Sequence, residues 1–296
     1  MNLETKLAGW TGPSSGSEQE KQDRTERMIR AAIQDHQAFR NCTLKVYAKG
    51  SYANNTNVKA DSDVDIVVQC NDVTYWEEAT PGAHPASYTR YTGIWTPDKL
   101  RTEVVAALRA KFPEHVDSSG STAVRIDSNT ARVEADVVPA FDYKYYFADG
   151  SHRAGSRVYK QDGSFLTNYP EQQLANGRAK NNATGTRYKK AVRILKRVEN
   201  AMVENGRHRE VPSFFMECLV YNCPNGLLTR GTWTEIVRGV IVHIWNELDG
   251  PEPTGTSKRW LEPNECKYLF HPSQPWTRED GRDFVKAAWG YLGFDS

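Results

Sequence analysis

The first half of the chain carries its apolar residues in short alternating or continuous runs, which are typical of β-strands. One run ends in three consecutive aliphatic residues, Ile66 to Val68, and this part of the strand is expected to be buried on both faces. The last run is expected to end at Pro139, and residues 71–96 are expected to form a loop rich in Pro, Gly and Tyr. We predict strands at residues 44–48, 63–68, 122–126 and 131–138.

Spacing near 3.6 residues predicts helices elsewhere. The polar, charge-laced residues 17–39 predict a long amphipathic helix, and Thr96-Pro97-Asp98 opens a second helix that runs to about Lys111. From about Leu174 the chain has helical spacing throughout. A small sheet with helices is therefore followed by a helical lobe, and the cleft between two such lobes is a usual place for a ligand. We predict helices in this lobe at residues 186–204, 213–221, 232–248 and 278–292.

Composition and charge narrow the class of protein. The 296 residues, 39% of them hydrophobic, suit one large folded domain or two lobes. The 38 basic and 37 acidic residues balance, so there is no global electrostatic case for coating a nucleic acid. No apolar run approaches the roughly 18 residues that a membrane-spanning helix needs, and the N-terminus lacks the apolar core of a secretion signal. We therefore expect a cytoplasmic protein with no membrane partner.

The five cysteines are an odd and scattered set, which argues against a disulfide framework. Cys218 and Cys223 could be zinc ligands together with His243 or His271, but they lack the tight paired spacing of structural zinc sites. Buried thiols are the expected outcome.

Three aspartates supply the first candidate chemistry. Asp63 and Asp65 lie two residues apart and therefore on one face of a strand, where their charges repel unless a cation neutralises them. Asp136 lies among valines in another strand-like run, where an unpaired charge is unfavourable. If the two strands pair, three carboxylates converge and can hold two magnesium or manganese ions roughly 3.5–4 Å apart, the geometry of nucleotidyl transfer. Glu134 shares the face of Asp136 and is interpreted as a neighbour, not a ligand.

Gly50 and Ser51 supply the second candidate feature. Glycine lets a backbone come close to a phosphate, and amides at a helix start can donate to its oxygens together with a serine hydroxyl. Lys49 adds positive charge. The simpler alternative is that Gly-Ser forms a turn and Asp-x-Asp only solvates a strand end. The presence of both features in one chain favours the phosphate and metal interpretation.

The chain resembles the polymerase-beta-like nucleotidyltransferases in their catalytic signature, through GS at 50–51, DSDVDIVV from 61 and ADVVPAF from 135. It is similar to the cyclic GMP-AMP synthase-like and oligoadenylate synthase-like branch through NYPEQQLANGRAKNNATGTRYKKAVRILKRVE and VPSFFMECLVYN. The closest resemblance, over nearly the whole chain, is to the bacterial CD-NTases, which make cyclic oligonucleotide signals in anti-phage defence. The stretch GSYANNTNV resembles members that use pyrimidine nucleotides.

The resemblance implies an α+β fold with a polymerase-beta-like nucleotidyltransferase core, a small mixed sheet with helices, over residues 1–173. A helical lobe would occupy residues 174–296, and the long N-terminal helix would brace both parts. The resemblance also assigns site residues. The metal-binding and catalytic triad would be Asp63, Asp65 and Asp136, with Asp136 accepting the proton of the attacking hydroxyl. Nucleotide-binding residues would be Gly50 and Ser51 on the phosphates, Lys196 and Ser213 on the donor triphosphate, and Phe214 stacked on the donor base.

The last three assignments each have a structural alternative. Lys196 could be one more solvated charge on a basic helix, and Ser213 could be the N-cap of the helix after Pro212. Phe214 could belong to the core, as aromatic residues at helix starts usually do.

The activity that the resemblance implies is the joining of ribonucleoside triphosphates, UTP or ATP among them, with two Mg²⁺ ions, which Mn²⁺ can replace. Pyrophosphate would leave and a cyclic dinucleotide would form. Asn168 lies near where a base-reading residue is expected, and an amide offers a donor and an acceptor to uracil; the alternative is a turn residue.

The chain differs in two ways from relatives that are activated by nucleic acid. No zinc-bearing His-Cys insertion is present, and the charges balance, so no double-stranded nucleic acid activator is expected. Constitutive activity or control by a regulatory protein partner is expected instead. Rival functions are transfer of a nucleotide to a protein, a tRNA end or a small molecule, and an inactive nucleotide-binding scaffold, against which the intact triad argues.

Overall fold

The structure, a computed structural model of the chain, describes residues 2–13, 15–58, 63–85 and 91–295. The chain divides into two compact units. The sheet unit comprises Ser15–Tyr52 and Lys59–Pro170, and the helical unit comprises Met1–Ser14, Ala53–Val58 and Glu171–Ser296. The chain therefore enters the helical unit directly after Gly50-Ser51-Tyr52 and then returns to the sheet unit.

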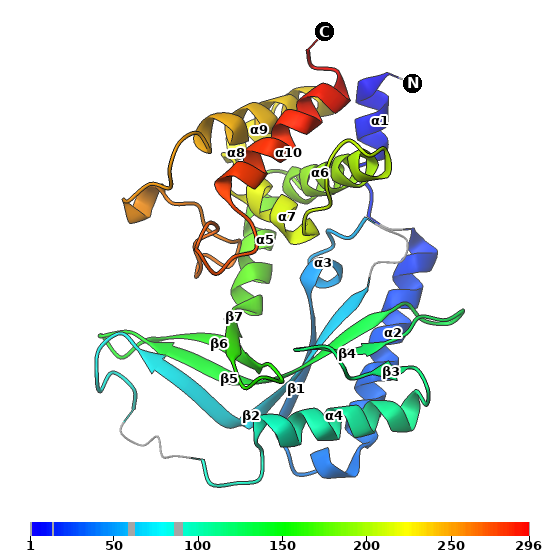
Figure 1. The fold of residues 1–296 in the computed structure, drawn as a ribbon, viewed down its shortest axis with the longest axis vertical. Helices are drawn as coiled ribbons and strands as arrows, with labels where there is room; N and C mark the ends of the chain where they lie inside the picture. Colours follow the sequence, from blue (N-terminus) through cyan, green and yellow to red (C-terminus); the bar gives the residue numbers. More distant parts are fainter. Residues whose placement is uncertain (1, 14, 59–62, 86–90, 296) are drawn as a thin grey trace. The chain divides into compact units, whose positions relative to one another are not determined.

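A single mixed sheet organises the sheet unit (Figure 1). Its two long central strands, β2 and β5, are parallel, and β1 pairs with β2 in the antiparallel direction. The main strand order is β1-β2-β5-β4-β3, with β6 added to β5 and β7 added to β6. The seven strands of the described residues are β1 (Leu44–Lys49), β2 (Val64–Glu78), β3 (Val116–Asp117), β4 (Val124–Ile126), β5 (Ala135–Tyr146), β6 (His152–Tyr159) and β7 (Phe165–Asn168).

Two helices, α2 (Gly16–Asp35) and α4 (Pro97–Lys111), contribute to the core of this unit. Helix α4 begins as predicted, with Thr96 capping it ahead of a proline, whereas α2 begins one residue before its predicted start, where Ser15 forms a capping box. Their apolar faces pack with β2 and β5 in one buried cluster. The first predicted helix ends at Asp35 and is followed by a short 3-10 turn, η1 (Gln37–Phe39).

Two predictions about where strands end are wrong. Strand β2 continues through residues 71–78, which were expected to begin a loop, and a register shift between Cys70 and Thr74 accommodates the change in pattern. Residues 86–90 of that expected loop lie outside the described residues. Strand β5 passes through Pro139, because this residue lies between the last position paired with β4, Val137, and the first paired with β6, Phe141. Among the described strands, none pairs with Pro139 on that edge, so its missing N–H interrupts no ladder there.

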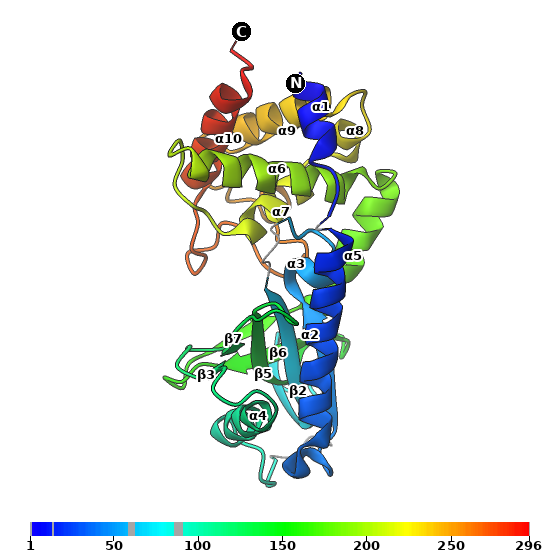
Figure 2. The same ribbon diagram turned by 90° about the vertical axis from the view of Figure 1, so that its right-hand side faces the viewer.

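The helical unit surrounds α6 (Arg187–Glu204), whose apolar side joins the core cluster of this unit (Figure 2). The predicted helices of this unit are confirmed within a residue or two, and Thr232 and Thr277 form capping boxes at the starts of α9 and α10. The short helix α3 (Gly50–Ala53) lies where the chain passes from the sheet unit into this unit. The other helices are α1 (Leu3–Gly9), α5 (Pro170–Ala183), α7 (Ser213–Tyr221), α8 (Asn225–Leu228), α9 (Trp233–Glu247), η2 (Thr256–Lys258) and α10 (Arg278–Leu292).

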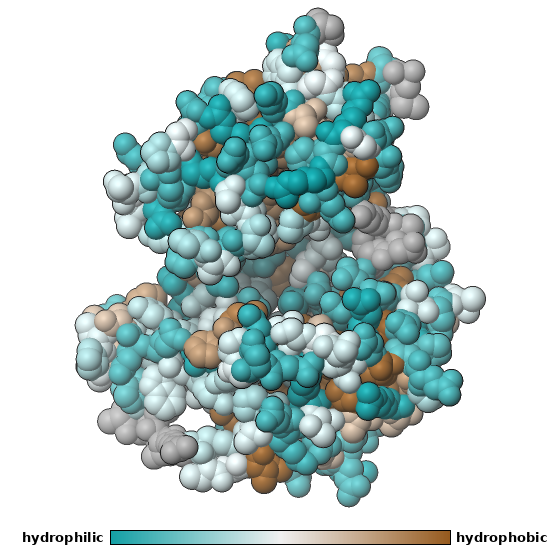
Figure 3. All heavy atoms as spheres, viewed as in Figure 1, coloured by the Kyte–Doolittle hydropathy of each residue, from teal (hydrophilic) through white to brown (hydrophobic). Residues whose placement is uncertain are grey.

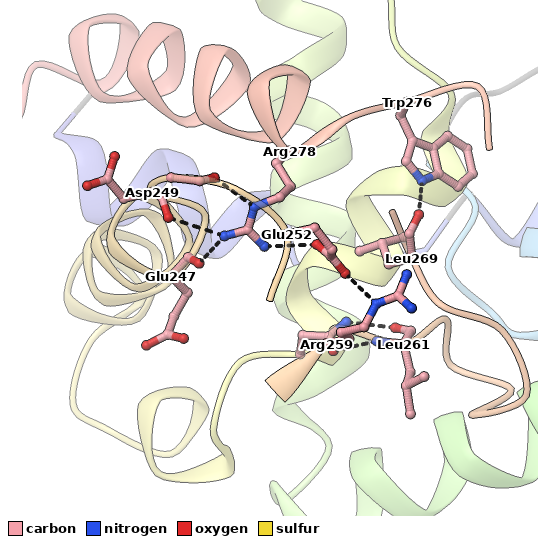
Figure 4. A network of polar contacts seen from close by, with 10 residues as sticks. Glu247, Asp249, Glu252, Arg259, Leu261, Leu269, Trp276 and Arg278 are labelled. Atoms are coloured by element: carbon pink, nitrogen blue, oxygen red, sulfur yellow. Dashed lines mark hydrogen bonds and ion pairs between the residues drawn. The ribbon is translucent and has the colours of Figure 1, made fainter. Parts of the chain in front are cut away.

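The long connection between α9 and α10 is held by polar contacts (Figure 4). Arg278 donates to the Glu247 carbonyl at 2.8 Å and to the Glu252 carboxylate at 3.1 Å. The same carboxylate accepts from Arg259 Nε at 2.9 Å, and the Trp276 indole N–H donates to the Leu269 carbonyl at 2.9 Å. These bonds fix a segment that has little regular secondary structure of its own.

The surface in Figure 3 is mostly hydrophilic, with hydrophobic residues scattered over it. Among the described helices, none is both long enough and apolar enough to cross a membrane.

Candidate active site

The parallel pairing of β2 and β5 brings two of the predicted carboxylates together. Asp65 is the register partner of Asp136, and each is the second residue of its strand. Paired residues of neighbouring strands present their side chains on the same face, with the strands about 4.8 Å apart. Asp63 directly precedes β2, and Val64 between the two aspartates is fully buried. The first two residues of the DSDVDIVV run, 61 and 62, lie outside the described residues.

The electrostatics of this cluster favour a bound cation. Partial desolvation, followed by the charges of Asp65 and Asp136, raises the pKa of Asp63. Desolvation and the charge of Asp65 likewise raise the pKa of Asp136. Lys49 Nζ lies 3.6 Å from Asp65 Oδ1, and Arg125 is the β4 register partner of Asp136. The charges of Lys49 and Arg125 lower the pKa of Asp136, but burial and the neighbouring carboxylates outweigh them.

Gly50 is fitted to the Asp65 carboxylate. Its φ of +69° belongs to the left-handed region, which side chains disfavour. A Cβ at this position would also lie 2.2 Å from Asp65 Oδ2, well inside van der Waals contact. Glycine is therefore required for two reasons: the backbone has a positive φ, and the Asp65 carboxylate leaves no room for a Cβ atom. Ser51 follows directly, within the short helix α3.

The carboxylates fit hard divalent cations, since oxygen donors are what Mg²⁺ and Mn²⁺ prefer. One Mg²⁺ with bonds of about 2.1 Å brings its ligands within about 4.2 Å of one another, whereas two ions about 4 Å apart accommodate ligands about 8 Å apart. Carboxylates at the starts of two paired strands are compatible with a two-ion site.

The two residues predicted to bind the donor triphosphate, Lys196 and Ser213, belong to the helical unit. Lys196 on α6 is only 2% exposed, and its Nζ lies 3.4 Å from Thr56 Oγ1, so the alternative of a solvated charge is wrong. Ser213 is exposed at the first position of α7; Pro212 is the N-cap, and the helix has no side-chain cap hydrogen bond, so the capping alternative is wrong as well. Their roles toward a nucleotide stay predictions.

Two residues predicted to contact a base occupy ordinary structural positions. Phe214 is half-buried, packs against the helical core and has its ring centroid 6.2 Å from that of Trp276, as its structural alternative expected. Asn168 ends β7 and pairs with Ser156, so it belongs to a strand rather than a turn. Their contacts with a base also stay predictions.

A buried network around Glu217 was missed by the sequence analysis. Glu217 on α7 is 1% exposed and accepts from Asn54 Nδ2 at 2.5 Å and from Thr56 Oγ1 at 2.9 Å. Burial lowers the pKa of the Lys196 ammonium, and the charge of Glu217 offsets part of this shift. Arg193 donates to the carbonyl of Asn55 at 2.6 Å. The segment that follows Gly50-Ser51 is thus held by polar side chains of the helical unit.

A signal for this network exists in the sequence. Glu217 is the one acidic residue in the apolar run FFMECLVY, where an unsatisfied carboxylate would be unfavourable. The polar stretch ANNTN supplies its donors, but nothing in local periodicity connects the two segments, which lie more than 160 positions apart.

We expect Glu217→Gln to destabilise the protein by about 2 kcal/mol, because it removes a buried charged acceptor. The measurement is the midpoint of urea unfolding of the full chain. The control is Glu265→Gln, which removes the charge from an exposed acceptor of the Tyr221 hydroxyl at 2.6 Å and should change stability by less than about 0.5 kcal/mol. Equal midpoints for the two variants would contradict an anchoring role for Glu217.

Comparison with known proteins identifies relatives along the whole chain. The family model described as the cGAS/DncV-like nucleotidyltransferase C-terminal helical domain matches residues 175–293. A protein of Legionella pneumophila named cyclic dipyrimidine nucleotide synthase CdnE is 36% identical, with 99% of this chain and 98% of the relative covered.

Two solved structures share the fold. The CdnE cyclic dinucleotide synthase of Elizabethkingia meningoseptica, determined with GTP and Apcpp, has a TM-score of 0.81 and 33% identity, covering 98% of each chain. The CdnE c-UMP-AMP synthase of Rhodothermus marinus, determined with Apcpp and Upnpp, has a TM-score of 0.84 and 26% identity. That match covers 99% of this chain and 97% of the neighbour. The nucleobases named for these relatives differ, although the chain aligns with all three over nearly its full length.

Proposed function

The chain belongs to the CD-NTase family, the cGAS/DncV-like nucleotidyltransferases, and on this premise we propose that it condenses ribonucleoside triphosphates, UTP among them, into a cyclic dinucleotide. Pyrophosphate leaves at each transfer, and the product is a signal in anti-phage defence. The observation that carries the proposal is the in-register pairing of Asp65 with Asp136 beside Gly50, which has no room for a side chain.

The proposed mechanism divides the chemistry among a few residues. Asp63, Asp65 and Asp136 would hold two Mg²⁺ ions, which when bound assist deprotonation of the attacking hydroxyl and neutralise the triphosphate. Asp136 accepts the proton of that hydroxyl. The backbone of Gly50 and the hydroxyl of Ser51 donate to phosphate oxygens. Little covalent chemistry is asked of the protein, since positioning and charge neutralisation lower the barrier.

The remaining assignments complete this proposal. Lys196 and Ser213 act on the donor triphosphate, and Phe214 stacks on its base. The exposed position of Ser213 at the start of α7 supports its part. The proposed catalytic core is residues 1–173 and the proposed helical lobe is residues 174–296; the compact helical unit also takes in Met1–Ser14 and Ala53–Val58. Activity needs no double-stranded nucleic acid, as the charge balance suggests, and constitutive activity or control by a regulatory protein partner is expected instead.

We expect UTP to be incorporated when the protein is given each radiolabelled triphosphate alone and in mixtures. The dipyrimidine product named for the Legionella relative supports this expectation. If Asn168 pairs with the uracil edge, Asn168→Ala should reduce uridine incorporation about tenfold relative to the other bases, the effect of about one hydrogen bond. Incorporation of purines alone would overturn the substrate assignment while leaving the reaction type intact.

Product analysis tests the reaction itself. Mass spectrometry of the product from mixed triphosphates should show a cyclic dinucleotide that resists phosphatase, because it has no terminal phosphate. Label that remains on a protein, a tRNA or a small acceptor would instead indicate a transferase of another kind.

A further inference from the structure

A second cluster of potential metal ligands lies in the sheet unit, away from the aspartates. The ligand atoms of Cys42, Cys70 and Asp72 all lie within 4.8 Å of one another, and the two Sγ atoms are 3.5 Å apart. Cys70 lies five residues beyond Asp65 on β2, about 16 Å along a strand that rises about 3.3 Å per residue. The proposed reaction makes no use of this cluster.

Strand pairing brings these three side chains together. Cys70 is paired with Leu44 at the start of β1, and continuing this antiparallel register places residue 42 opposite residue 72. The Asn71 N–H donates to the Thr43 carbonyl at 2.8 Å, and the Thr43 N–H donates to Asp72 Oδ1 at 3.2 Å. Backbone bonds therefore fix both segments beside each other and orient the carboxylate, as outer contacts of metal ligands usually do.

The arrangement has the chemistry of a thiophilic cation site. Two ligands at Zn–S bonds of about 2.3 Å in tetrahedral geometry have sulfur atoms about 3.8 Å apart, close to the 3.5 Å found here. A disulfide would require the two sulfurs to approach to about 2.0 Å. The third group, a carboxylate, is a ligand for zinc and has no part in a disulfide. The set is thus closer to metal-binding geometry than to a cross-link.

The environment allows an ion to enter and be held. Cys70 is fully buried, whereas Cys42 and Asp72 are half-buried and lie on the accessible side of the cluster. We propose that Cys42, Cys70 and Asp72 bind a thiophilic divalent cation of the Zn²⁺ type, with a fourth position for water. The ion would cross-link the segment that precedes β1 with strand β2. This cross-link lies at the end of the two strands that is remote from the aspartates.

Cobalt(II) tests this site independently of enzymatic activity, because cobalt bound to thiolate absorbs in the near ultraviolet through sulfur-to-metal charge transfer. The reduced, metal-free full chain is titrated with Co²⁺. We expect this absorption to saturate at about one equivalent, and Zn²⁺ to abolish it by displacement. Cobalt bound only to the aspartates gives no such band.

Three variants test whether the cobalt absorption band arises from this cluster. Cys42→Ser should lose it, and Asp72→Asn, which keeps its shape and can still accept from Thr43, should weaken cobalt binding at least about tenfold. Cys266→Ser is the matched control, since Cys266 is another half-buried thiol and belongs to the helical unit. Circular dichroism verifies that each variant is folded. Absence of the band in the wild type, its survival in folded Cys42→Ser, or its loss in Cys266→Ser would overturn the proposal.

Discussion

The Asp136→Asn variant should fold normally and form cyclic product at a rate on the order of a thousandfold below that of the wild type. Asparagine keeps the size of the side chain but removes the charge that would bind a cation and accept the proton of the attacking hydroxyl. Metal ions contribute several kcal/mol of charge stabilisation to such reactions, and each 1.36 kcal/mol is about a factor of ten in rate. The measurement is incorporation of radiolabelled triphosphate at saturating Mg²⁺, with circular dichroism as the check on folding.

Glu134 provides the matched control for this experiment. It lies two residues before Asp136, and its carboxylate is 3.7 Å from Arg125 Nε. Glu134→Gln removes one negative charge from the same neighbourhood without removing a proposed ligand. We expect its rate to stay within about threefold of the wild type, a change of less than about 1 kcal/mol. Equal losses in the two variants would mean that general electrostatics, and not a ligand role for Asp136, explains the effect.

The second large effect is expected from Gly50→Ala. The added methyl group would enter the space of the Asp65 carboxylate, which lies 2.2 Å from the ideal Cβ position. Either Asp65 or the Gly50-Ser51 backbone must move by about 1 Å, and a displacement of that size at a reacting centre lowers the rate by about a hundredfold. The positive φ adds about 1–2 kcal/mol of destabilisation.

The Gly150→Ala variant separates the effect of backbone strain from the effect of the steric clash with Asp65. Gly150 has a φ of +80° in the same unit, and nothing lies within 4 Å of its ideal Cβ position. It should lose a similar amount of stability, measured by urea unfolding, and retain its rate of product formation. A Gly50→Ala enzyme as active as Gly150→Ala would show that the close approach of Gly50 to Asp65 is unimportant for catalysis.

Local signals in the sequence predict much of this fold. The capping residues Ser15, Thr96, Thr232 and Thr277 precede helices that begin where their apolar periodicity begins. The strand β1 and the buried residues 66–68 also follow from their pattern. The convergence of Asp65 and Asp136 was predicted on the condition that their strands pair, and the structure confirms that pairing.

Local sequence patterns did not predict the features that depend on contacts between segments far apart in the chain. Strands β6 and β7 were not predicted, and β5 continues past Pro139, with which no described strand pairs on one edge. The bonds of Glu217 to Asn54 and Thr56 join segments that no periodicity connects. Cys42 and Cys70 lie 28 positions apart and meet through the pairing of β1 with β2. In each case tertiary contacts override or add to what the local sequence specifies.

The central claim is that Asp63, Asp65 and Asp136 together hold the divalent ions of the reaction. Anomalous diffraction from crystals grown with Mn²⁺ and a non-hydrolysable UTP analogue tests it most directly. We predict anomalous peaks within bonding distance of all three carboxylates and of the triphosphate. A map in which manganese accompanies the bound nucleotide but makes no contact with Asp136 would contradict the claim.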